Sequence, residues 1–162
     1  MIDIISATTN DLPLINKLAV TIWEATYENI LSKEQLAYMH LKMNSVQALS
    51  KLINQDHNFI IPYENGTAKG YSCYKIYADK ARIEKLYVLP DEHKKGIGKL
   101  MMNYIIEKAK EHVSIIELNV NRQNEAVKFY KNMGFEILKD VDIPIGEGFF
   151  MNDYIMQKAI VY

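Results

Sequence analysis

The feature that most constrains the fold is a strand, a glycine turn, a helix and a second strand, all between Arg82 and Asn121. The stretch "RIEKLYVL" predicts a strand that ends before Pro90, because the residue ahead of a proline favours extended backbone. From Ile97 the apolar residues recur at helical spacing, and "SIIELNVN" predicts the next strand. A strand–helix–strand unit of this kind places its two strands parallel in one sheet. The chain is therefore expected to be an α/β protein.

The remaining strands indicate a sheet that is antiparallel elsewhere. Asn65-Gly66 lies between two apolar runs, which is a strong signal for a hairpin turn. Further strands are predicted within residues 1–8, 58–79, 135–145 and 149–160. Together these patterns predict a mixed, twisted, mostly antiparallel sheet of about seven strands, with one parallel pair and helices on both faces.

Helix signals fill the gaps between these strands. Residues 11–28 carry apolar side chains at helical spacing after a cap at Thr9 or Asn10. Ser32 and the glutamine three residues later have the spacing of a capping box, so a second helix follows. A third, short helix is predicted for residues 45–54 with Asn44 as its cap, and "NEAVKFYKNMG" predicts a helix closed by Gly134.

Length and composition narrow the class of protein. The chain has 162 residues, which suits a single domain over residues 1–162. A net charge of −1 provides no general field for nucleic acid, and no apolar run is long enough to span a membrane. The N-terminus is too polar for a signal peptide, so we expect a cytoplasmic protein. The single cysteine, Cys73, and four scattered histidines predict neither a disulfide framework nor a metal site.

The turn "EHKKGIGKL" has the composition of an anion site. The first N–H groups of a helix are unpaired and lie at the positive end of its dipole, and glycines let a ligand approach the backbone. A Walker A motif is excluded, because His93 stands at its first glycine position and Leu100 follows Lys99. Met101 stands where a dinucleotide fingerprint needs its third glycine. The turn therefore fits a pyrophosphate-sized anion, or it is a plain strand-to-helix turn.

Two blocks of residues resemble a known family. Counting from His93, His-Lys-Lys-Gly-Ile-Gly closely resembles the acetyl-CoA signature Gln/Arg-x-x-Gly-x-Gly/Ala of the GNAT superfamily of N-acetyltransferases. As in that family, the signature follows a strand of the type "LYVLP" and opens a long helix. A second family block, "NEAVKFYKNMGFEI", lies at the expected distance in residues 124–137. The resemblance implies the acyl-CoA N-acyltransferase fold, acetyl-CoA as co-substrate and transfer of an acetyl group to an amine.

The resemblance also implies where acetyl-CoA binds. Its pyrophosphate would sit on the N–H groups of residues 94–99, and its pantetheine would bond to the backbone of Leu86 and Val88. His93 stands where the family usually has Gln or Arg, and the family's asparagine slot holds Gln123, with Asn124 one residue later. Either amide is a candidate. The implied cofactor-binding residues are Leu86, Tyr87, Val88, His93, Lys94, Lys95, Gly96, Ile97, Gly98, Lys99, Gln123, Asn124 and Tyr130.

Amine acetylation needs a proton acceptor and benefits from a proton donor. A lysine-like amine has a pKa of about 10.4, so roughly one molecule in 2,500 is neutral at pH 7. Glu84 is the first candidate for the base and Glu117 the second, because a buried carboxylate has a raised pKa. The alternative for Glu84 is an ion pair with Arg82 or Lys85, or exposure to solvent. Tyr130 matches the family's tyrosine general acid, although a tyrosine in isolation at this spacing would indicate a core residue beside Phe129.

The amine acceptor is the partner that the sequence constrains least. The segment "IWEATYENILSKEQLAYM" is similar to the N-terminal region of bacterial polyamine acetyltransferases, and peptide amines are a second class. Trp23 and Tyr27, with carboxylates nearby, would suit a cationic amine, but their spacing is more typical of core contacts of an amphipathic helix.

The sequence leaves three further points open: a binding role without turnover, the part of the cysteine and the assembly. A module that binds acetyl-CoA or CoA as a sensor would share the glycine turn and would not need Tyr130. Cys73 lies between apolar and aromatic neighbours and is expected to be an inert core thiol, so transfer without a covalent intermediate is predicted. The connection "IGEGFFMN" between the last strands is a candidate contact in a homodimer.

Overall fold

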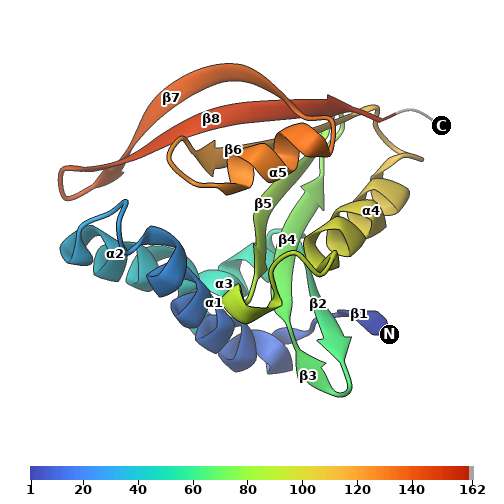
Figure 1. Ribbon diagram of the computed structural model, residues 1–162, viewed down its shortest axis with the longest axis horizontal. Helices are drawn as coiled ribbons and strands as arrows, with labels where there is room; N and C mark the ends of the chain where they lie inside the picture. Colours follow the sequence, from blue (N-terminus) through green and yellow to red (C-terminus); the bar gives the residue numbers. More distant parts are fainter. Residues whose placement is uncertain (161–162) are drawn as a thin grey trace.

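The computed structural model describes residues 1–160, and these residues form one sheet of eight strands (Figure 1). The strand order is β1-β2-β4-β5-β6-β8-β7, with the short β3 paired to β2. Within this range every pair is antiparallel except β5 with β6, so the predicted sheet is confirmed. The strands are β1 (Ile2–Ser6), β2 (Asn58–Glu64), β3 (Thr67–Ala68), β4 (Gly70–Ile76), β5 (Ala81–Val88), β6 (Ile115–Asn121), β7 (Glu136–Gly146) and β8 (Phe149–Ala159).

Helices cover both faces of the sheet, as predicted (Figure 1). One face carries α1 (Leu12–Tyr27), α2 (Lys33–Met39) and α3 (Val46–Asn54), and the other carries α4 (Ile97–Ala109) and α5 (Ala126–Asn132). Each face has its own apolar core. Fully buried side chains repeat at helical spacing on α1 and on α4. Burying each such side chain contributes about 1.5–3 kcal/mol, which holds the helices on the sheet.

The parallel pair is short. Residues 81–83 of β5 pair with residues 116–118 of β6, and no further pairs join the two strands over the described residues. Residues 84–88 and 119–121 therefore leave the ladder while β5 stays paired to β4 and β6 stays paired to β8. The sheet opens in its middle, at the carboxyl ends of its two parallel strands.

A bulge in β5 changes which side chains face which core. Ile83 pairs with Tyr74 and Lys85 pairs with Cys73, so Glu84 is an extra residue without a partner in β4. Ahead of the bulge, Ile83 packs in the core under α4. Beyond it, the even-numbered residues of β5 face that same core, and Lys85 faces α1.

Two helix starts differ from prediction by one residue. Thr8, rather than Thr9 or Asn10, caps a 3₁₀ turn ahead of α1, and Ser45, rather than Asn44, caps α3. Thr8 and Ser45 have extended backbone, which lets the hydroxyl turn back to a free N–H group of the helix. Asn44 is instead completely buried in a π-helical turn that follows α2.

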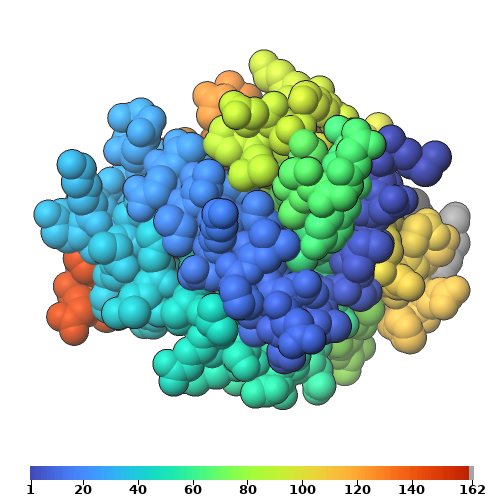
Figure 2. All heavy atoms as spheres, turned by 90° about the horizontal axis from the view of Figure 1, so that it is seen from below, coloured from blue at the N-terminus to red at the C-terminus, as the bar shows by residue number. Residues whose placement is uncertain are grey.

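The last two strands form a long hairpin that reaches back to α2. Ser32 caps α2 as predicted, but the side chain of Gln35 donates to the carbonyl of Phe150 at 2.7 Å instead of closing a capping box. Tyr38 donates to the carbonyl of Ile145 at 2.6 Å, and its ring lies 5.4 Å from that of Phe149. Figure 2 shows this hairpin tip (orange-red) beyond the cyan and blue residues of α1–α3. The connection "IGEGFFMN", the candidate dimer contact, is therefore held by α2.

Candidate active site

A cavity of about 1490 Å³ lies where β5 and β6 separate. One side is formed by the unpaired part of β5, by α5 and by the turn before α4. Its opposite side is formed by α1, α2, the start of α3 and β8. Small-molecule sites usually measure roughly 300–1,000 Å³. The cavity is therefore large enough for an extended ligand together with a second reactant.

The glycine turn has the geometry of an anion site. Gly96 precedes α4 with a φ of +81°, a left-handed conformation that glycine adopts without a steric penalty. Lys94 has a φ of +65°, so the turn is tightly wound on both sides of Lys95. A Cβ atom on Gly98 would lie 3.3 Å from the ring of Phe129, which shows how closely α4 and α5 approach. The first N–H groups of α4 thus lie at the cavity wall.

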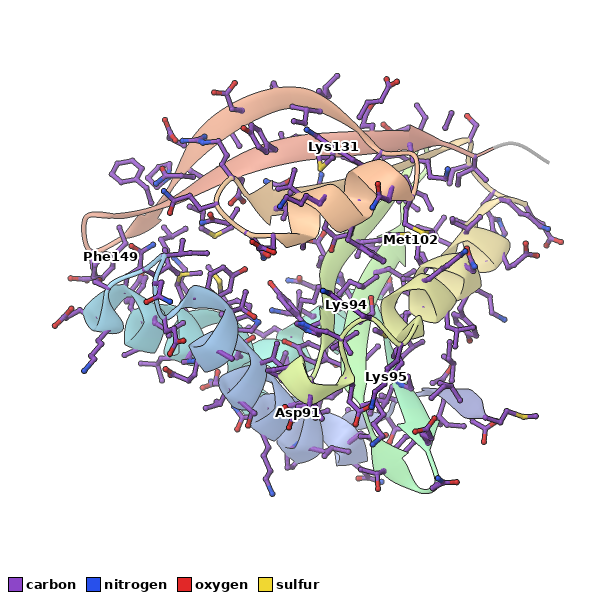
Figure 3. The ribbon with its side chains drawn as sticks, viewed as in Figure 1. Asp91, Lys94, Lys95, Met102, Lys131 and Phe149 are labelled. Atoms are coloured by element: carbon purple, nitrogen blue, oxygen red, sulfur yellow. The ribbon has the colours of Figure 1, made fainter. Side chains whose placement is uncertain are left out.

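The three lysines of the turn have different environments. Lys94 and Lys99 line the cavity. Lys95 instead binds Glu92 at 3.0 Å, and Glu92 also binds Lys69 at 2.9 Å. Lys69 and Lys95 together hold the pKa of Glu92 below its usual value. In Figure 3 Lys94 lies on the side towards α5 and Lys95 on the side towards β2, so the structure favours Lys94 and Lys99 as phosphate contacts.

The free edge of β5 faces the cavity. The carbonyls of Lys85 and Tyr87 point towards β4. The hydroxyl of Ser72 on β4 donates to the carbonyl of Lys85 at 2.5 Å, and a Cβ on Gly70 would touch the carbonyl of Tyr87. Successive residues of a strand direct their backbone groups to opposite edges, so those of Leu86 and Val88 face away from β4. This orientation supports the predicted pantetheine contacts at Leu86 and Val88.

His93 lies at the end of that edge. Its Nε2 lies 3.0 Å from the carbonyl of Val88, which holds the exposed ring against the end of the strand. His93 and Tyr87 also line the cavity. The imidazole ring thus lies against the carbonyl of Val88, one of the backbone groups that the resemblance assigns to the cofactor. The N–H of Val88 and the N–H and carbonyl of Leu86 remain directed at the open edge.

Helix α5 brings the second predicted block to the same cavity. Tyr130 is 6% exposed, lines the cavity and packs against the rings of Phe129 and Phe135. Burial raises the pKa of Tyr130 far above its usual value, so its hydroxyl stays protonated. Gln123 and Asn124 both line the cavity, and the Oδ1 of Asn124 accepts from the N–H of Ala126 at 2.9 Å.

The two predicted bases differ in position. Glu84 lines the cavity, where its carboxylate lies 3.5 Å from the guanidinium of Arg82 and 3.9 Å from the ring of His57. Glu117 is buried outside the cavity lining and binds Arg82, Lys80 at 3.2 Å and Gln157 at 2.8 Å. The hydrogen bonds from Gln157 and Lys80 and the charge of Arg82 lower the pKa of Glu117 despite its burial. The structure therefore favours Glu84 over Glu117.

Lys85 is a buried cation that sequence reasoning did not assign to the site. Its ammonium lies 3.3 Å from the carbonyl of Met43 and from Oδ1 of Asn44, and 5.3 Å from the ring centre of Trp23. Burial lowers the pKa of Lys85 to about 8. The bulge at Glu84 places Lys85 on the α1 side, and a bulge has no clear signal in the sequence "RIEKLYV".

Asp153 and Asn119 were also missed. Asp153, on β8, is 3% exposed and lines the cavity with Asn119 of β6. Asp153 shares a strand face with Phe149 and Met151 in an alternating strand, and a carboxylate on such an apolar face is the sequence signal that could have identified it.

Comparison with known proteins defines the class of this enzyme. Residues 27–144 match the family model described as the acetyltransferase (GNAT) domain. The matched range contains the glycine turn, β5, β6 and α5. The chain therefore belongs to the GNAT family of acetyltransferases, which are acyltransferases with acetyl-CoA as co-substrate.

Individual relatives extend over the whole chain. Spermidine N(1)-acetyltransferase of Thermoplasma acidophilum is 29% identical over 97% of this chain and 96% of its own length. The crystal structure of PaiA N-acetyltransferase from the same organism, in complex with coenzyme A, has a TM-score of 0.80 at 28% identity, covering 98% of this chain and 99% of that one. Ribosomal-protein-S18-alanine N-acetyltransferase from Escherichia coli has a TM-score of 0.76 at 19% identity, over 100% and 96% of the two chains, which is a likeness of fold.

Two further observations concern membranes and metals. Over residues 1–160, none of the helices combines the length and the apolar character needed to cross a bilayer. Within the same residues, no three His, Cys, Asp or Glu side chains are grouped so as to hold a metal ion.

Proposed function

We propose that this acetyltransferase moves the acetyl group of acetyl-CoA directly to a primary amine. The open edge of β5 at Leu86 and Val88, beside the glycine turn, is the observation that carries the proposal. Pantetheine bonded to that edge would lead from the N-terminus of α4 to the point where β5 leaves β6. An N–H group of β5 would there donate to the thioester carbonyl and stabilise the oxyanion. The α1 side of the cavity then receives the amine.

Direct transfer is supported by the surroundings of the only cysteine. Cys73 is completely buried and lies outside the cavity lining. Burial raises the pKa of the Cys73 thiol to about 12, and the thiolate rather than the thiol is the nucleophile. On the other side of the thioester, Tyr130 is the proposed acid for the departing CoA thiolate. A protonated hydroxyl on a helix at the cavity wall suits that role.

A polyamine is the acceptor class that we propose first, with peptide amines second. The spermidine N(1)-acetyltransferase of Thermoplasma acidophilum is related over nearly the whole length of both chains. The α1 wall of the cavity presents the rings of Trp23 and Tyr27, whose centres lie 5.5 Å apart, and Glu84 and Asp153 supply carboxylates. Rings and carboxylates together favour a cationic chain.

The test is a thermal-shift titration with acetyl-CoA, CoA and ADP, followed by turnover. At a ligand concentration of 100 Kd, binding adds about 2.7 kcal/mol to the free energy of unfolding. We expect acetyl-CoA and CoA to stabilise the protein well beyond ADP, because ADP lacks pantetheine. Mass spectrometry with spermidine, an N-terminal peptide and a lysine peptide then identifies the acceptor. Strong binding without turnover of any amine would instead indicate a sensor of acetyl-CoA. A cytoplasmic location and a homodimer stay predictions.

A further inference from the structure

Asp153 is a buried carboxylate that no cation neutralises within residues 1–160. Its side chain takes part in none of the ion pairs found there. Its side-chain hydrogen bond comes from Asn119, whose Nδ2 donates to Oδ2 over a long 3.4 Å. Burying an ionised carboxylate that is 3% exposed and weakly hydrogen-bonded costs free energy unless a cation or a further hydrogen-bond donor binds it. Asp153 lines the cavity, so a cationic ligand can reach it there.

The orientation of Asn119 shows which atoms Asp153 meets. The guanidinium of Arg82 donates to Oδ1 of Asn119 at 2.7 Å, and a guanidinium has no acceptor atom. The carbonyl oxygen of the amide therefore faces Arg82 and its NH₂ group faces Asp153. Asp153 accepts from that group, which is the arrangement that an ionised carboxylate needs. Arg82 and Asn119 together hold a proton acceptor in place.

The groups packed around Asp153 come from four elements. Asn119 lies on β6, Tyr27 on α1, and Arg122 follows β6, while β7 contributes backbone and the exposed Asp142. Arg122 donates to the backbone carbonyl of Asp153 at 3.2 Å and binds the carboxylate of Asp142 at 2.7 Å. Burial raises the pKa of Asp153, and the hydrogen bond from Asn119 and the charge of Arg122 oppose that rise.

Tyr27 links Asp153 electrostatically to Tyr130, the proposed acid. The charge of Asp153 contributes to the raised pKa of Tyr27, after burial, and Tyr27 in turn acts on the pKa of Tyr130. The hydroxyl of Tyr27 also lies 3.2 Å from that of Tyr87 on β5. Asp153, Tyr27 and Tyr130 all line the same cavity.

We propose that Asp153 accepts the proton of the acceptor ammonium, with Asn119 as its positioning residue. The inference rests on the proposed function and deepens it. The ammonium gives one proton to Asp153, and the freed nitrogen lone pair forms the C–N bond to the thioester carbon. The C–S bond breaks, the CoA sulfur takes a proton from Tyr130, and the second nitrogen proton replaces it on Tyr130. Asp153 then releases its proton to solvent through the cavity, so the products are an amide, CoA thiol and one proton.

The test uses two amines of the same shape. One is spermidine, and the other is a spermidine analogue with two fluorine atoms on the carbon next to that of the acetylated amine, which makes its ammonium far more acidic. Asp153→Asn should lower kcat/KM for spermidine by about 10²-fold at neutral pH and leave the rate with the fluorinated amine nearly unchanged. Asp140→Asn makes the same change on an exposed residue of β7 opposite Tyr154 and serves as the control. Thermal shift with acetyl-CoA checks that each variant is folded and binds the cofactor.

A second variant tests the role of Asn119 without removing the carboxylate. Asn119→Ala removes a hydrogen bond that lowers the pKa of Asp153, so the acidic limb of the kcat/KM profile should move to higher pH. Equal losses with both amines in Asp153→Asn, or an unmoved limb in Asn119→Ala, would show a structural role and overturn the inference. A selective loss in Glu84→Gln instead would assign the base to Glu84. If the wild type acetylates neither amine nor any peptide, the proposed function itself fails.

Discussion

Replacing Gly96 with alanine tests whether the glycine turn is the cofactor site. Gly96 has a φ of +81°, and a Cβ there would meet no atom within 4 Å, so the cost is one of backbone conformation alone. Left-handed backbone costs a residue with a Cβ about 1–2 kcal/mol. Where the turn keeps its left-handed conformation, that corresponds to a melting temperature lower by about 2–8 °C in a protein of this size. Differential scanning fluorimetry measures this loss directly.

Gly66 provides a matched control. It has a φ of +77° in the hairpin turn between β2 and β3, and a Cβ there would also meet nothing within 4 Å. Gly66→Ala should therefore lower the melting temperature by a similar amount. Gly66 does not line the cavity, so its substitution should leave acetyl-CoA affinity unchanged.

The two variants should differ in their Kd for acetyl-CoA. The cost of about 1–2 kcal/mol is divided between stability and binding. Where the free turn of Gly96→Ala relaxes to an ordinary backbone, the melting temperature falls less, and binding must restore the left-handed conformation. Full relaxation raises Kd by about 5- to 30-fold. Isothermal titration calorimetry measures Kd for both variants. A Kd equal to that of Gly66→Ala, together with a smaller loss of melting temperature, would refute the assignment of this turn to the pyrophosphate.

Three further substitutions test the surrounding residues. Tyr130→Phe should keep acetyl-CoA affinity and lower kcat by about 10²-fold, and an unchanged kcat across pH in stopped assays of CoA release would remove Tyr130 from the mechanism. The pKa of Lys85 falls from 10.5 to about 8 on folding, so the folded protein loses this proton at lower pH than the unfolded chain. The unfolding free energy of wild type, compared with that of Lys85→Met, should therefore rise between pH 8 and 10.5. Urea titrations should show a rise on the order of 2–3 kcal/mol. The pKa of Glu117 is lowered in the folded protein. The unfolding free energy of wild type should therefore exceed that of Glu117→Gln above about pH 4.5, and the difference should disappear in acid. A difference that stays constant with pH would contradict the ion pairs with Arg82 and Lys80.

The fold was predictable because its signals are local. Helical spacing on α1 and α4 and the Asn65-Gly66 turn each act within a few residues, and each is present in the structure. The caps at Thr8 and Ser45 were placed one residue late and one residue early, because neighbouring residues offer the same side-chain chemistry. Local backbone conformation decides between them.

The acceptor side of the cavity was much less predictable, because tertiary contacts create it. Lys85, Asn119 and Asp153 stand in strands whose sequence suits either face of a sheet. Asn44 looked like a helix cap, and its side chain instead links Lys85 to His40 in the interior. No spacing rule within a single element brings these residues together, since they come from β5, β6, β8 and the turn after α2.

The site forms where two regularities of the sheet end. The parallel pairing of β5 with β6 stops after Ile83, which frees one edge of β5 for a ligand. One residue later the bulge at Glu84 reverses the alternation, so that Lys85 faces α1 while Leu86 faces the core under α4. In a regular strand without the bulge, Lys85 would share the face of Ile83 and place a charge in the apolar core. The bulge therefore separates the edge that we propose for the cofactor from the charged wall that we propose for the acceptor along a single strand, and the cavity lies between them.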